Sequence, residues 1–419
     1  MAAAASGTLG AAENPPPVSP IRQVAYHEPL PELSELSLAE LTAEVEARNP
    51  SVQAMVAAWQ AASERYPQVV SLDDPMFGFL LGPQGLGHDG GWMVMAAQKI
   101  PWCGKRELQG EIARAEADAA SRDVDDVRLR LAEATAAGLA DYYQARRELE
   151  INAANAELMT QFREIAKVRY ESNQVSGQDV LQADLELAEL ESRRAEIIRE
   201  EKVATARINT LLHLPADSAL PPPPKELPAP AEVPPAEGLQ RWAVQQRPDL
   251  AAEAARIRAD EAALNLADKE FYPDLEVVAK YDAFMPEDMR PQVGLNLNVP
   301  IRRTRRCAAL KEAAAKLQQR RAEYENRLDE IQFGVQSAAD RLVEQRTVLR
   351  LYVEKVLPAA EANIRSAQAN YSTGKIDFLR LIDAWRQLYR QQERRQQAAA
   401  ECLRRLAELE RAIGGPMQK

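Results

Sequence analysis

The chain repeats itself at a spacing of about 200 residues, and this repeat constrains the fold more than any other feature of the sequence. In each copy an apolar stretch closes at a proline, Pro101 in the first and Pro300 in the second. A long run rich in Ala, Arg and Glu follows, and a turn led by a tyrosine, Tyr170 or Tyr371, interrupts it. Because both landmarks keep the same spacing, we expect one architecture built from two similar halves.

The repeat divides the 419 residues into four segments. Residues 1–36 are rich in Ala, Gly and Pro, which predicts an extended tail. A Pro-rich linker at 221–238 separates the two copies. We expect it to be extended rather than helical, because proline lacks the N–H that a helix needs. The first copy therefore spans 37–220 and the second spans 239–414.

Each copy predicts the same succession of a β-hairpin, a very long helix and a return helix. In the first copy we expect these elements at about 68–100, 104–172 and 177–213. In the second copy we expect them at about 274–300, 304–370 and 376–413.

A shorter helix precedes each hairpin. Ser37, with a glutamate three residues later, marks the start of the first one. The proline-to-proline stretch from Pro50 to Pro67 in the first copy is about eight residues shorter than the stretch from Pro248 to Pro273. We therefore expect about two helical turns to be missing from the first copy.

The long runs carry most of the mass. No proline occurs between Gly104 and Tyr170, and at 1.5 Å per residue this run predicts a helix on the order of 100 Å long. Apolar residues recur at steps of three and four, which predicts coiled-coil seams, and many of these residues are alanines that allow close approach. One such seam near the C-terminus comprises Ala399, Cys402, Leu406, Leu409 and Ile413.

The strand-like material lies between the short and the long helices. In the second copy apolar residues alternate with polar or small ones, which predicts strands with one apolar face. These residues are Leu275, Val277, Val293, Leu295, Leu297 and Val299. The first copy is less regular, and a Gly-rich turn runs from Gly82 to Gly91. The charged residues Lys280, Asp282 and Asp73-Asp74 either face a lumen or mark strand ends.

Two hairpins cannot close a barrel within one chain. Four strands from each of several identical chains can close one, and a closed barrel leaves no free strand edges. The sequence therefore favours a sheet that is completed by further copies of the chain.

Composition excludes several classes of function. A net charge of −11 argues against a nucleic-acid partner, because phosphate binding needs concentrated Lys and Arg. The basic run from Arg302 to Arg306 precedes an acidic helix and is interpreted as a solvated helix start. No Ser/His/Asp arrangement, phosphate-binding glycine loop or metal triad is present in the sequence. An enzyme is thus the weakest interpretation, and we expect no cofactor.

The cysteines and histidines do not form a recognisable site. The cysteines form no CxxC or Cys/His cluster, so neither a zinc site nor a disulfide framework is predicted. Cys402 falls on the C-terminal seam and is interpreted as a small packing residue. The other two are Cys103 and Cys307, and the equally scattered histidines are His27, His88 and His213.

The sequence gives no membrane-spanning helix, because no window of eighteen apolar residues occurs. Its N-terminus lacks a basic region and an apolar core, so no signal peptide is visible. Either the chain stays in the cytoplasm or its export signal is not contained in this sequence.

The duplicated unit of helix, hairpin, very long helix, tyrosine-led turn and return helix resembles the TolC family of outer-membrane efflux channels. The resemblance runs from about Ser37 to Ile413 and includes the helix starts at Asn49-Pro50 and Arg247-Pro248. It implies a mainly α fold with a small β part, in which long antiparallel coiled-coil helices adjoin two hairpins. Three chains would form a twelve-stranded barrel and an α-helical tunnel through the periplasm.

Members of this family are passive exit ducts rather than enzymes. The resemblance therefore implies a homotrimer in the lipid of the outer membrane, with a periplasmic adaptor (membrane fusion protein) and an inner-membrane RND-type pump as partners. The stretch from Gln98 to Arg106, Gln-Lys-Ile-Pro-Trp-Cys-Gly-Lys-Arg, resembles the heavy-metal-exporting branch, the outer components of cation efflux systems. A metal cargo follows from this analogy alone, since no Cys/His/Met cluster supports it.

The resemblance also places a periplasmic aperture at the helix-turn ends, where the family has acidic rings and a tyrosine-centred polar lock. Asp383 stands at the place of a ring aspartate, and Arg380 where some members have a second acid. Asp179 is expected to bond to Tyr371 or to pair with Arg380. As a bland alternative, Asp179 and Asp383 are solvated acids favoured by the helix dipole. The residues expected to form the turns are Tyr170, Gly177 and Gly374.

The competing hypothesis is a soluble or peripheral coiled-coil scaffold without channel activity. A scaffold explains the missing signal peptide. It does not explain two hairpins with alternating apolar faces.

Overall fold

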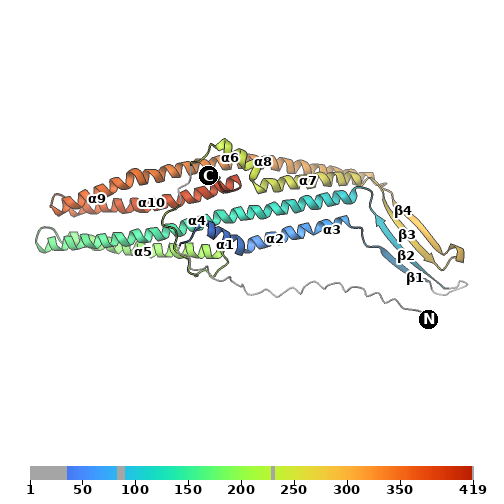
Figure 1. Cartoon of the computed structure of the whole chain (residues 1–419), viewed down its shortest axis with the longest axis horizontal. Coiled ribbons are helices and arrows are strands. Elements are labelled where there is room, and N and C mark those ends of the chain that lie inside the picture. Colours follow the sequence, from blue (N-terminus) through green and yellow to red (C-terminus); the bar gives the residue numbers. More distant parts are fainter. Residues whose placement is uncertain (1–34, 83–89, 228–231, 418–419) are drawn as a thin grey trace.

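The computed structural model describes residues 35–82, 90–227 and 232–417 and shows an elongated, mainly helical molecule with a small sheet at one end (Figure 1). This confirms the expected mainly α fold with a small β part. The expectations for nearly all of the tail, for most of the Gly-rich turn and for part of the Pro-rich linker lie outside the described residues. His27 and His88 fall among them.

The first half contains three short helices, a hairpin and two long helices. They are α1 (Leu38–Arg48), α2 (Pro50–Ser63), α3 (Arg65–Val70), β1 (Met76–Gly82), β2 (Gly91–Ile100), α4 (Lys105–Glu171) and α5 (Gln178–Leu211). The second half repeats this order with α6 (Ala236–Gln246), α7 (Pro248–Lys269), β3 (Asp274–Asp282), η1 (Glu287–Met289), β4 (Pro291–Asn298), α8 (Arg303–Leu351), η2 (Tyr352–Val356), α9 (Leu357–Ser372) and α10 (Phe378–Ile413).

The short helices begin at the expected caps. The Ser37 hydroxyl accepts a hydrogen bond from the Glu40 backbone N–H at 3.3 Å, which starts α1. The Asn49 side chain accepts from the Ser51 N–H and donates to the Leu211 carbonyl, both at 2.9 Å. Asn49 therefore separates α1 from α2 and ties this junction to the end of α5.

The expectation that the first copy lacks two helical turns is wrong. Helix α3 continues through Pro67 to Val70, so α2 and α3 together nearly match α7 in length. Pro67 is tolerated because it lies in the first turn of α3, where a backbone N–H has no partner within the helix. For the same reason residues 68–70, expected to open the first hairpin, are helical, and the strand begins at Met76.

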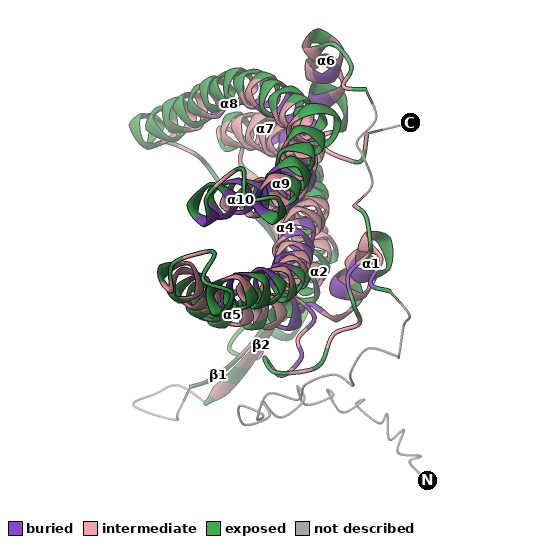
Figure 2. Ribbon diagram, turned by 90° about the vertical axis from the view of Figure 1, so that its left-hand side faces the viewer, coloured by how far each residue is buried: buried purple, intermediate pink, exposed green. Residues whose placement is uncertain are grey.

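Helix α4 is the centre of the molecule and packs against α5, α7 and α10. Seen along the long axis, the helices form a curved layer with α1 and α6 on its convex side (Figure 2). No helix in the described part of the chain combines the length and apolarity needed to cross a membrane.

Several apolar clusters hold the helical part together, and the two largest lie at the tip and near the middle. The tip cluster joins α4, α5, α9 and α10, and its largest members include Phe162, Tyr371, Phe378, Trp385 and Met159. The equatorial cluster joins α6, α7, α8 and α10 and contains Leu239, Leu250, Val335, Leu342, Cys402 and Leu409, among others. Cys402 is buried there, while Cys103 and Cys307 are exposed.

The second long helix is continuous but irregular. Helix α8 passes through the π-helical turn η2 into α9, and Pro358 is the second residue of α9. Proline has no N–H to donate to the preceding turn, and a wider turn accommodates this missing bond. The first copy has no such break, because α4 is a single helix from Lys105 to Glu171.

The four strands form one antiparallel sheet in the order β1-β2-β3-β4. The central pair joins the two halves of the chain, with Ala96 opposite Ala279. Within the described residues β1 and β4 have no partner on their outer sides. The sheet is therefore an open ribbon that continues the helical layer at one end of the molecule (Figure 1).

Candidate functional site

The two helix-turn tips have the same backbone. Asn173 and Gly374 occupy equivalent places and both adopt a positive φ, 56° and 72°. At each tip the residue with positive φ donates its N–H to the tyrosine carbonyl: Asn173 to Tyr170 at 2.9 Å and Gly374 to Tyr371 at 3.0 Å. Asparagine and glycine tolerate this left-handed conformation better than other residues, so each tip ends its helix without strain.

The two tyrosines differ in their surroundings. Tyr371 is 2% exposed and lies in the tip cluster, with its ring 5.4 Å from that of Phe378. Tyr170 is 51% exposed, and its ring lies over Gly177. Tyr371 is therefore a packing residue of the tip cluster, whereas the Tyr170 ring packs on Gly177 and is half in solvent.

Two residues of the first copy bind Tyr371. Arg169 donates to the Tyr371 carbonyl at 2.7 Å and lies over its ring, 4.7 Å from the ring centre. The Tyr371 hydroxyl donates to an Asp179 carboxylate oxygen at 3.4 Å. We call Arg169, Asp179 and Tyr371 the tip lock. Of the two partners proposed for Asp179, the structure places it with Tyr371.

Burial changes the acidity of both ionisable groups that share this hydrogen bond. Burial, together with the negative charge of Asp179, raises the pKa of Tyr371 to about 12, so its hydroxyl keeps its proton. Burial also raises the pKa of the Asp179 carboxyl above its usual value, and Asp377 adds to this effect. The Tyr371 hydroxyl and Arg169 act in the opposite direction.

Arg380 and Asp383 have no hydrogen bond or ion pair with this lock among the described residues. Arg380 is 76% exposed, and its carboxylate neighbour is Asp377, 4.0 Å away on the same helix. Asp383 is 60% exposed and lies 4.0 Å from Arg386. The structure therefore does not bring Arg380 to Asp179, and it leaves the Asp383 carboxylate largely in solvent.

Arg169 is a member of the lock that sequence reasoning missed, and a second missed contact lies nearby. Arg386 of α10 forms two hydrogen bonds with the buried Glu186 of α5. A similar pair, Arg193 and Glu393, lies farther along these helices at 3.2 Å. In both pairs the partners are 200 residues apart, so the repeat spacing itself was the available signal.

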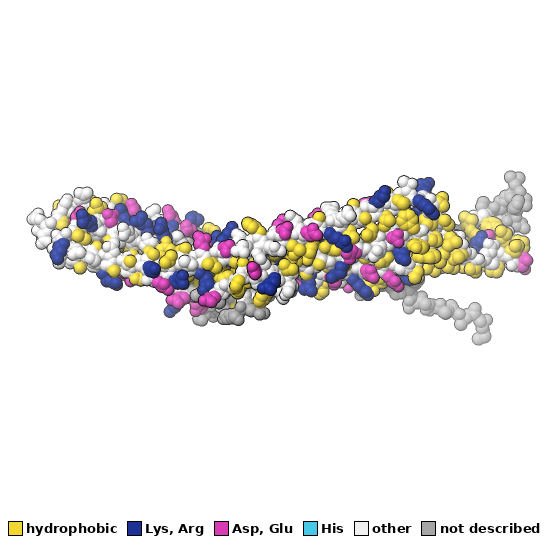
Figure 3. Space-filling view, turned by 90° about the horizontal axis from the view of Figure 1, so that it is seen from above, with side chains coloured by type: hydrophobic (Ala, Val, Ile, Leu, Met, Phe, Trp, Pro, Cys, Tyr) yellow, Lys and Arg dark blue, Asp and Glu magenta, His cyan; other side chains and the backbone are white. Residues whose placement is uncertain are grey.

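The sheet has one continuous apolar face. Directly opposed residues of antiparallel strands share a face, so Phe79, Val94 and Tyr281 lie on the same side. The full set on this face is Phe77, Phe79, Leu81, Trp92, Val94, Ala96, Gln98, Ile100, Leu275, Val277, Ala279, Tyr281, Pro291, Val293, Leu295 and Leu297. Figure 3 shows hydrophobic side chains gathered toward this end, with mixed charges over the helices.

The opposite face is mixed and carries all the charged residues of the strands. Its polar residues are Lys99, Asp274, Glu276, Lys280, Asp282, Gln292, Asn296 and Asn298, and its apolar residues include Met76, Leu80, Met93, Met95 and Val278. Lys280 and Asp282 therefore do not interrupt the apolar face, and Asp73-Asp74 precede β1. One face without charges, opposite a face that carries all the charges of the strands, is the pattern of a wall that separates lipid from water.

The residues that resemble the metal-exporting branch lie where the sheet meets the helices. Lys105 is buried, and its ammonium contacts the Asp274 carboxylate at 2.9 Å and the Glu270 carboxylate at 3.5 Å. Asp274 also accepts from the Trp102 N–H at 3.0 Å, and Trp102 stacks on Tyr272. This part of the motif thus fastens the strand ends to α4 and α7. In the described residues no group of three or more His, Cys, Asp or Glu is placed to hold a metal.

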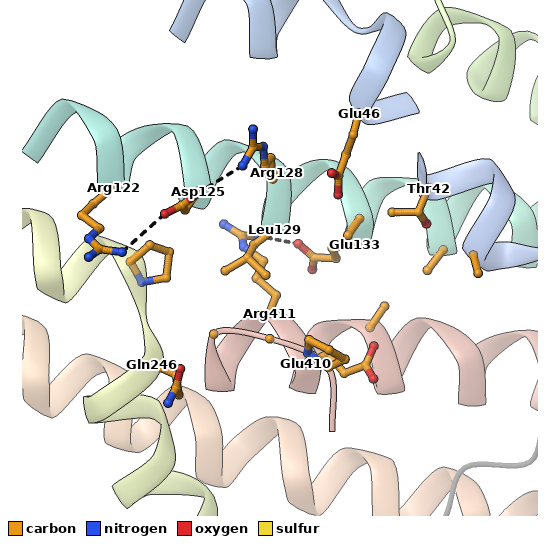
Figure 4. Close-up of a pocket in the computed structure, with 18 of the residues that line it drawn as sticks. Thr42, Glu46, Arg122, Asp125, Arg128, Leu129, Glu133, Gln246, Glu410 and Arg411 are labelled. Carbon is orange, nitrogen blue, oxygen red and sulfur yellow. Dashed lines mark hydrogen bonds and ion pairs between the residues drawn. The ribbon is translucent and has the colours of Figure 1, made fainter. Parts of the chain in front are cut away.

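A hollow of about 710 Å³ lies among α1, α4, α7 and α10 (Figure 4). Its charged side chains neutralise each other: Asp125 lies between Arg122 and Arg128, and Arg411 pairs with Glu133 at 2.6 Å. The pairs of Asp125 lie within α4, whereas the pair of Arg411 and Glu133 joins α10 to α4. We assign the hollow no function.

Residues 239–415 match the family model described as outer membrane efflux protein. A comparison with curated proteins gives no match. Among solved structures, the outer-membrane channel OprN is 20% identical, with a TM-score of 0.78 over 95% of this chain and 99% of that chain. The chain has the fold of outer-membrane channels.

Two further structures show the same fold. CusC is 16% identical, with a TM-score of 0.75 over 95% of this chain and 99% of that chain. VceC of Vibrio cholerae is 18% identical, with a TM-score of 0.75 over 91% of this chain and 97% of that chain. The second half of this chain carries the pattern of the outer membrane efflux family, and the whole chain has the TolC-like architecture.

Proposed function

We propose that this protein is the outer-membrane channel of a tripartite efflux system. Three copies form a passive exit duct, in which the sheets join into a twelve-stranded barrel and the helices form a tunnel through the periplasm. The observation that carries this proposal is the open sheet, continuous with the long helices, with one continuous apolar face and all the charged strand residues on the other face. The efflux-family match and the channel structures support it.

The partners follow from this placement. The apolar face contacts outer-membrane lipid, and the helical end contacts a periplasmic adaptor and, through it or directly, an inner-membrane RND-type pump. Catalysis is left to the pump, and this chain acts as a duct rather than as an enzyme.

The first experiment separates a channel from a coiled-coil scaffold. Expressed with an export signal, the channel is expected in detergent extracts of the outer membrane and as a trimer in detergent. Reconstituted into planar bilayers, it should conduct ions. Recovery as a soluble protein that leaves bilayers silent would support the scaffold instead.

We propose that the tip is the gate of the duct. The tip lock joins the two helix pairs of one chain, and breaking it removes the contacts nearest the turns that hold α9 to α4 and α5. Three copies of the exposed Asp383 would form a ring of negative charge that favours cations. Arg380 lies about one helical turn closer to the tip than Asp383 and would add positive charge there.

Asp383→Ala tests the ring in planar bilayers. We expect reduced cation selectivity and altered current, because three negative charges leave the narrow end. Asp217→Ala, which removes an exposed carboxylate in the turn after α5, serves as the matched control. Unchanged current and unchanged selectivity in Asp383→Ala would remove this residue from the gate.

A heavy-metal cargo is the finer proposal, and the resemblance of residues 98–106 supports it. The structure gives that stretch a joining role at Lys105. Deletion of the gene in its host should therefore be scored against divalent metals and against organic toxicants in parallel. Sensitivity to organic compounds alone would assign a different cargo to the same duct.

A further inference from the structure

Between the tip cluster and the clusters nearer the middle, the helices pass through a level where, among the described residues, none belongs to an apolar cluster. We call this level the polar layer. It comprises residues 143–155 of α4, 191–203 of α5, 350–359 of the helix that runs from α8 through η2 to α9, and 390–399 of α10. The apolar clusters thus hold the helices on both sides of the polar layer and leave the layer itself to other contacts.

Hydrogen bonds between side chains join α4 to α10 inside the polar layer. The Asn155 amide donates to the Gln392 side-chain oxygen at 2.9 Å, and the Tyr143 hydroxyl donates to the Gln396 side-chain oxygen at 3.2 Å. The polar side chains that are buried in the layer are Glu148, Asn152, Asn155 and Gln396. Apolar residues fill the seam of an ordinary coiled coil, so this seam differs from the packing on either side of it.

One arginine joins three helices in the same layer. Arg193 of α5 contacts the Glu148 carboxylate of α4 at 2.9 Å and the Glu393 carboxylate of α10 at 3.2 Å. It also contacts the Glu196 carboxylate of its own helix at 3.1 Å, so it keeps two partners if α10 moves away. Water replaces polar contacts that open, whereas a parted apolar cluster exposes its surface to water. A bend placed in the polar layer therefore exposes less apolar surface than a bend placed within either cluster.

The backbone of the second long helix is irregular at the same level. The end of η2 and Glu393 both lie about four helical turns from the second tip, and η2 contacts α10. None of the η2 residues is buried, and Pro358 follows them. Sharp bends in helices occur at prolines and at π turns. The other three helices pass through the layer without such a turn, so the second half has a place to bend that the first half lacks.

We propose that the polar layer is the hinge of the gate, about which the tip segments of α9 and α10 swing away from α4 and α5 once the tip lock opens. The bend falls at η2, and α10 follows by a gentle curve. Glu393 moves with α10 and leaves Arg193, which stays with Glu148. Because the swing exposes part of the tip cluster, the free chain rests closed. The inference rests on the proposed function, since it locates the pivot of the proposed gate.

Reversible cross-links on the two sides of the polar layer test where the hinge lies. Glu186→Cys/Arg386→Cys joins α5 to α10 on the tip side, and Asp141→Cys/Arg404→Cys joins α4 to α10 on the equatorial side. In both pairs the native side chains are hydrogen-bonded to each other, so a short bis-maleimide with a reducible disulfide can join the two cysteines. The background for both variants lacks the two exposed cysteines, Cys103 and Cys307.

Opening is counted in planar bilayers before and after reduction of the linker. With the linker intact, we expect the tip-side variant to open about tenfold less often than after reduction, because the segment beyond the hinge is held. The equatorial variant should open equally often in both states. Full opening with the tip-side linker intact, or loss of opening with the equatorial one, would overturn the hinge. A parent protein that never conducts would instead overturn the proposed function.

Pro358→Ala tests the bend at η2 independently. Alanine supplies the backbone N–H that proline lacks, which favours a straight helix, and we expect opening to become about threefold rarer. Pro358 is exposed, so the substitution leaves both apolar clusters intact. The matched control is Pro67→Ala in α3, beside the sheet, which should leave opening unchanged. An opening frequency that is equal in wild type and in Pro358→Ala would overturn the bend at η2.

Discussion

The first and second helix-turn tips, residues 169–178 and 370–379, share a backbone but bury different side chains. At the second tip Tyr371 is packed against Phe378. At the first tip the equivalent tyrosine, Tyr170, is half exposed, and a glycine takes the place of the phenylalanine. Duplication preserved the turn, while the surrounding side chains diverged.

The divergence makes one tip hold the other. Arg169 and Asp179 belong to the first copy, and both bind Tyr371 of the second. At the places equivalent to Arg169 and Asp179, the second copy has Asn370 and Arg380, and neither binds Tyr170 among the described contacts. The lock is therefore a contact between unequal halves, and movement at this end must separate one half from the other.

The largest expected difference between the tips concerns their tyrosines. Tyr371→Ala removes a buried ring and should lower the free energy of unfolding by about 3 kcal/mol or more. Tyr170→Ala removes a ring that is half in solvent and should lower it by less than about 1 kcal/mol. Chemical denaturation of the two variants checks this. Equal losses would show that the two tips contribute alike.

The next effect concerns the arginine. Arg169→Ala removes a charged hydrogen bond to the Tyr371 carbonyl and a cation–π contact, which should cost about 1.5–2 kcal/mol and raise channel opening in bilayers. The matched control is Asn370→Ala at the equivalent place, which loses only a 3.4 Å contact with Ser366. Opening that rises equally in both variants would contradict a one-sided lock.

A smaller effect tests the shared backbone. Gly374→Ala places a side chain at a φ of 72° and should cost about 1 kcal/mol. Gly374→Asn should cost only a few tenths of a kcal/mol, because asparagine tolerates this conformation, as it does at position 173. Thermal unfolding of the two variants provides the measurement. Alanine tolerated as well as asparagine would contradict the equivalence of the two turns.

The smallest effect is a pH dependence. Burial raises the pKa of Asp179 above its usual 3.8, so the folded chain holds this proton more tightly than the unfolded chain does. The protonated Asp179 therefore adds to the free energy of unfolding at acid pH, and this contribution is lost as the pH rises from 3.8 through the raised pKa. Asp179→Asn keeps an oxygen acceptor for Tyr371 and should flatten this decline, whereas Asp217→Asn should not. If the free energy of unfolding changed with pH in the same way in wild type and in Asp179→Asn, the assignment of this pH dependence to Asp179 would be wrong.

Local pattern was sufficient for much of the fold. The period-two alternation placed the second hairpin within two residues of the ends of β3 and β4, and capping chemistry placed the start of α1 at Ser37. The first hairpin was placed less well, since Val69 and Val70 look strand-like while the helical turn begun before Pro67 continues through them. At Val69 and Val70 the continuing helix therefore outweighs the β-propensity of the valines.

The candidate site was predicted only in part. Asp179 was expected to bond to Tyr371 or to pair with Arg380, and it bonds to Tyr371. Arg169 was missed, because an arginine in a run rich in arginines carries no local signal. The charges on β3 were ambiguous for a similar reason. Their orientation depends on the pairing of β2 with β3, residues that lie far apart in the sequence.

The π-helical turn η2 changes which residues of the second long helix are buried. An extra residue in one turn rotates everything after it by about 100° about the helix axis. Before η2, Val335, Ala338 and Leu342 pack into the equatorial cluster, and after it Ile364 and Ala367 pack into the tip cluster. The helix therefore carries two heptad phases rather than one, and Val353, between them, stands exposed. A single periodic pattern extended across Tyr352–Val356 assigns the wrong face to one of the two cores.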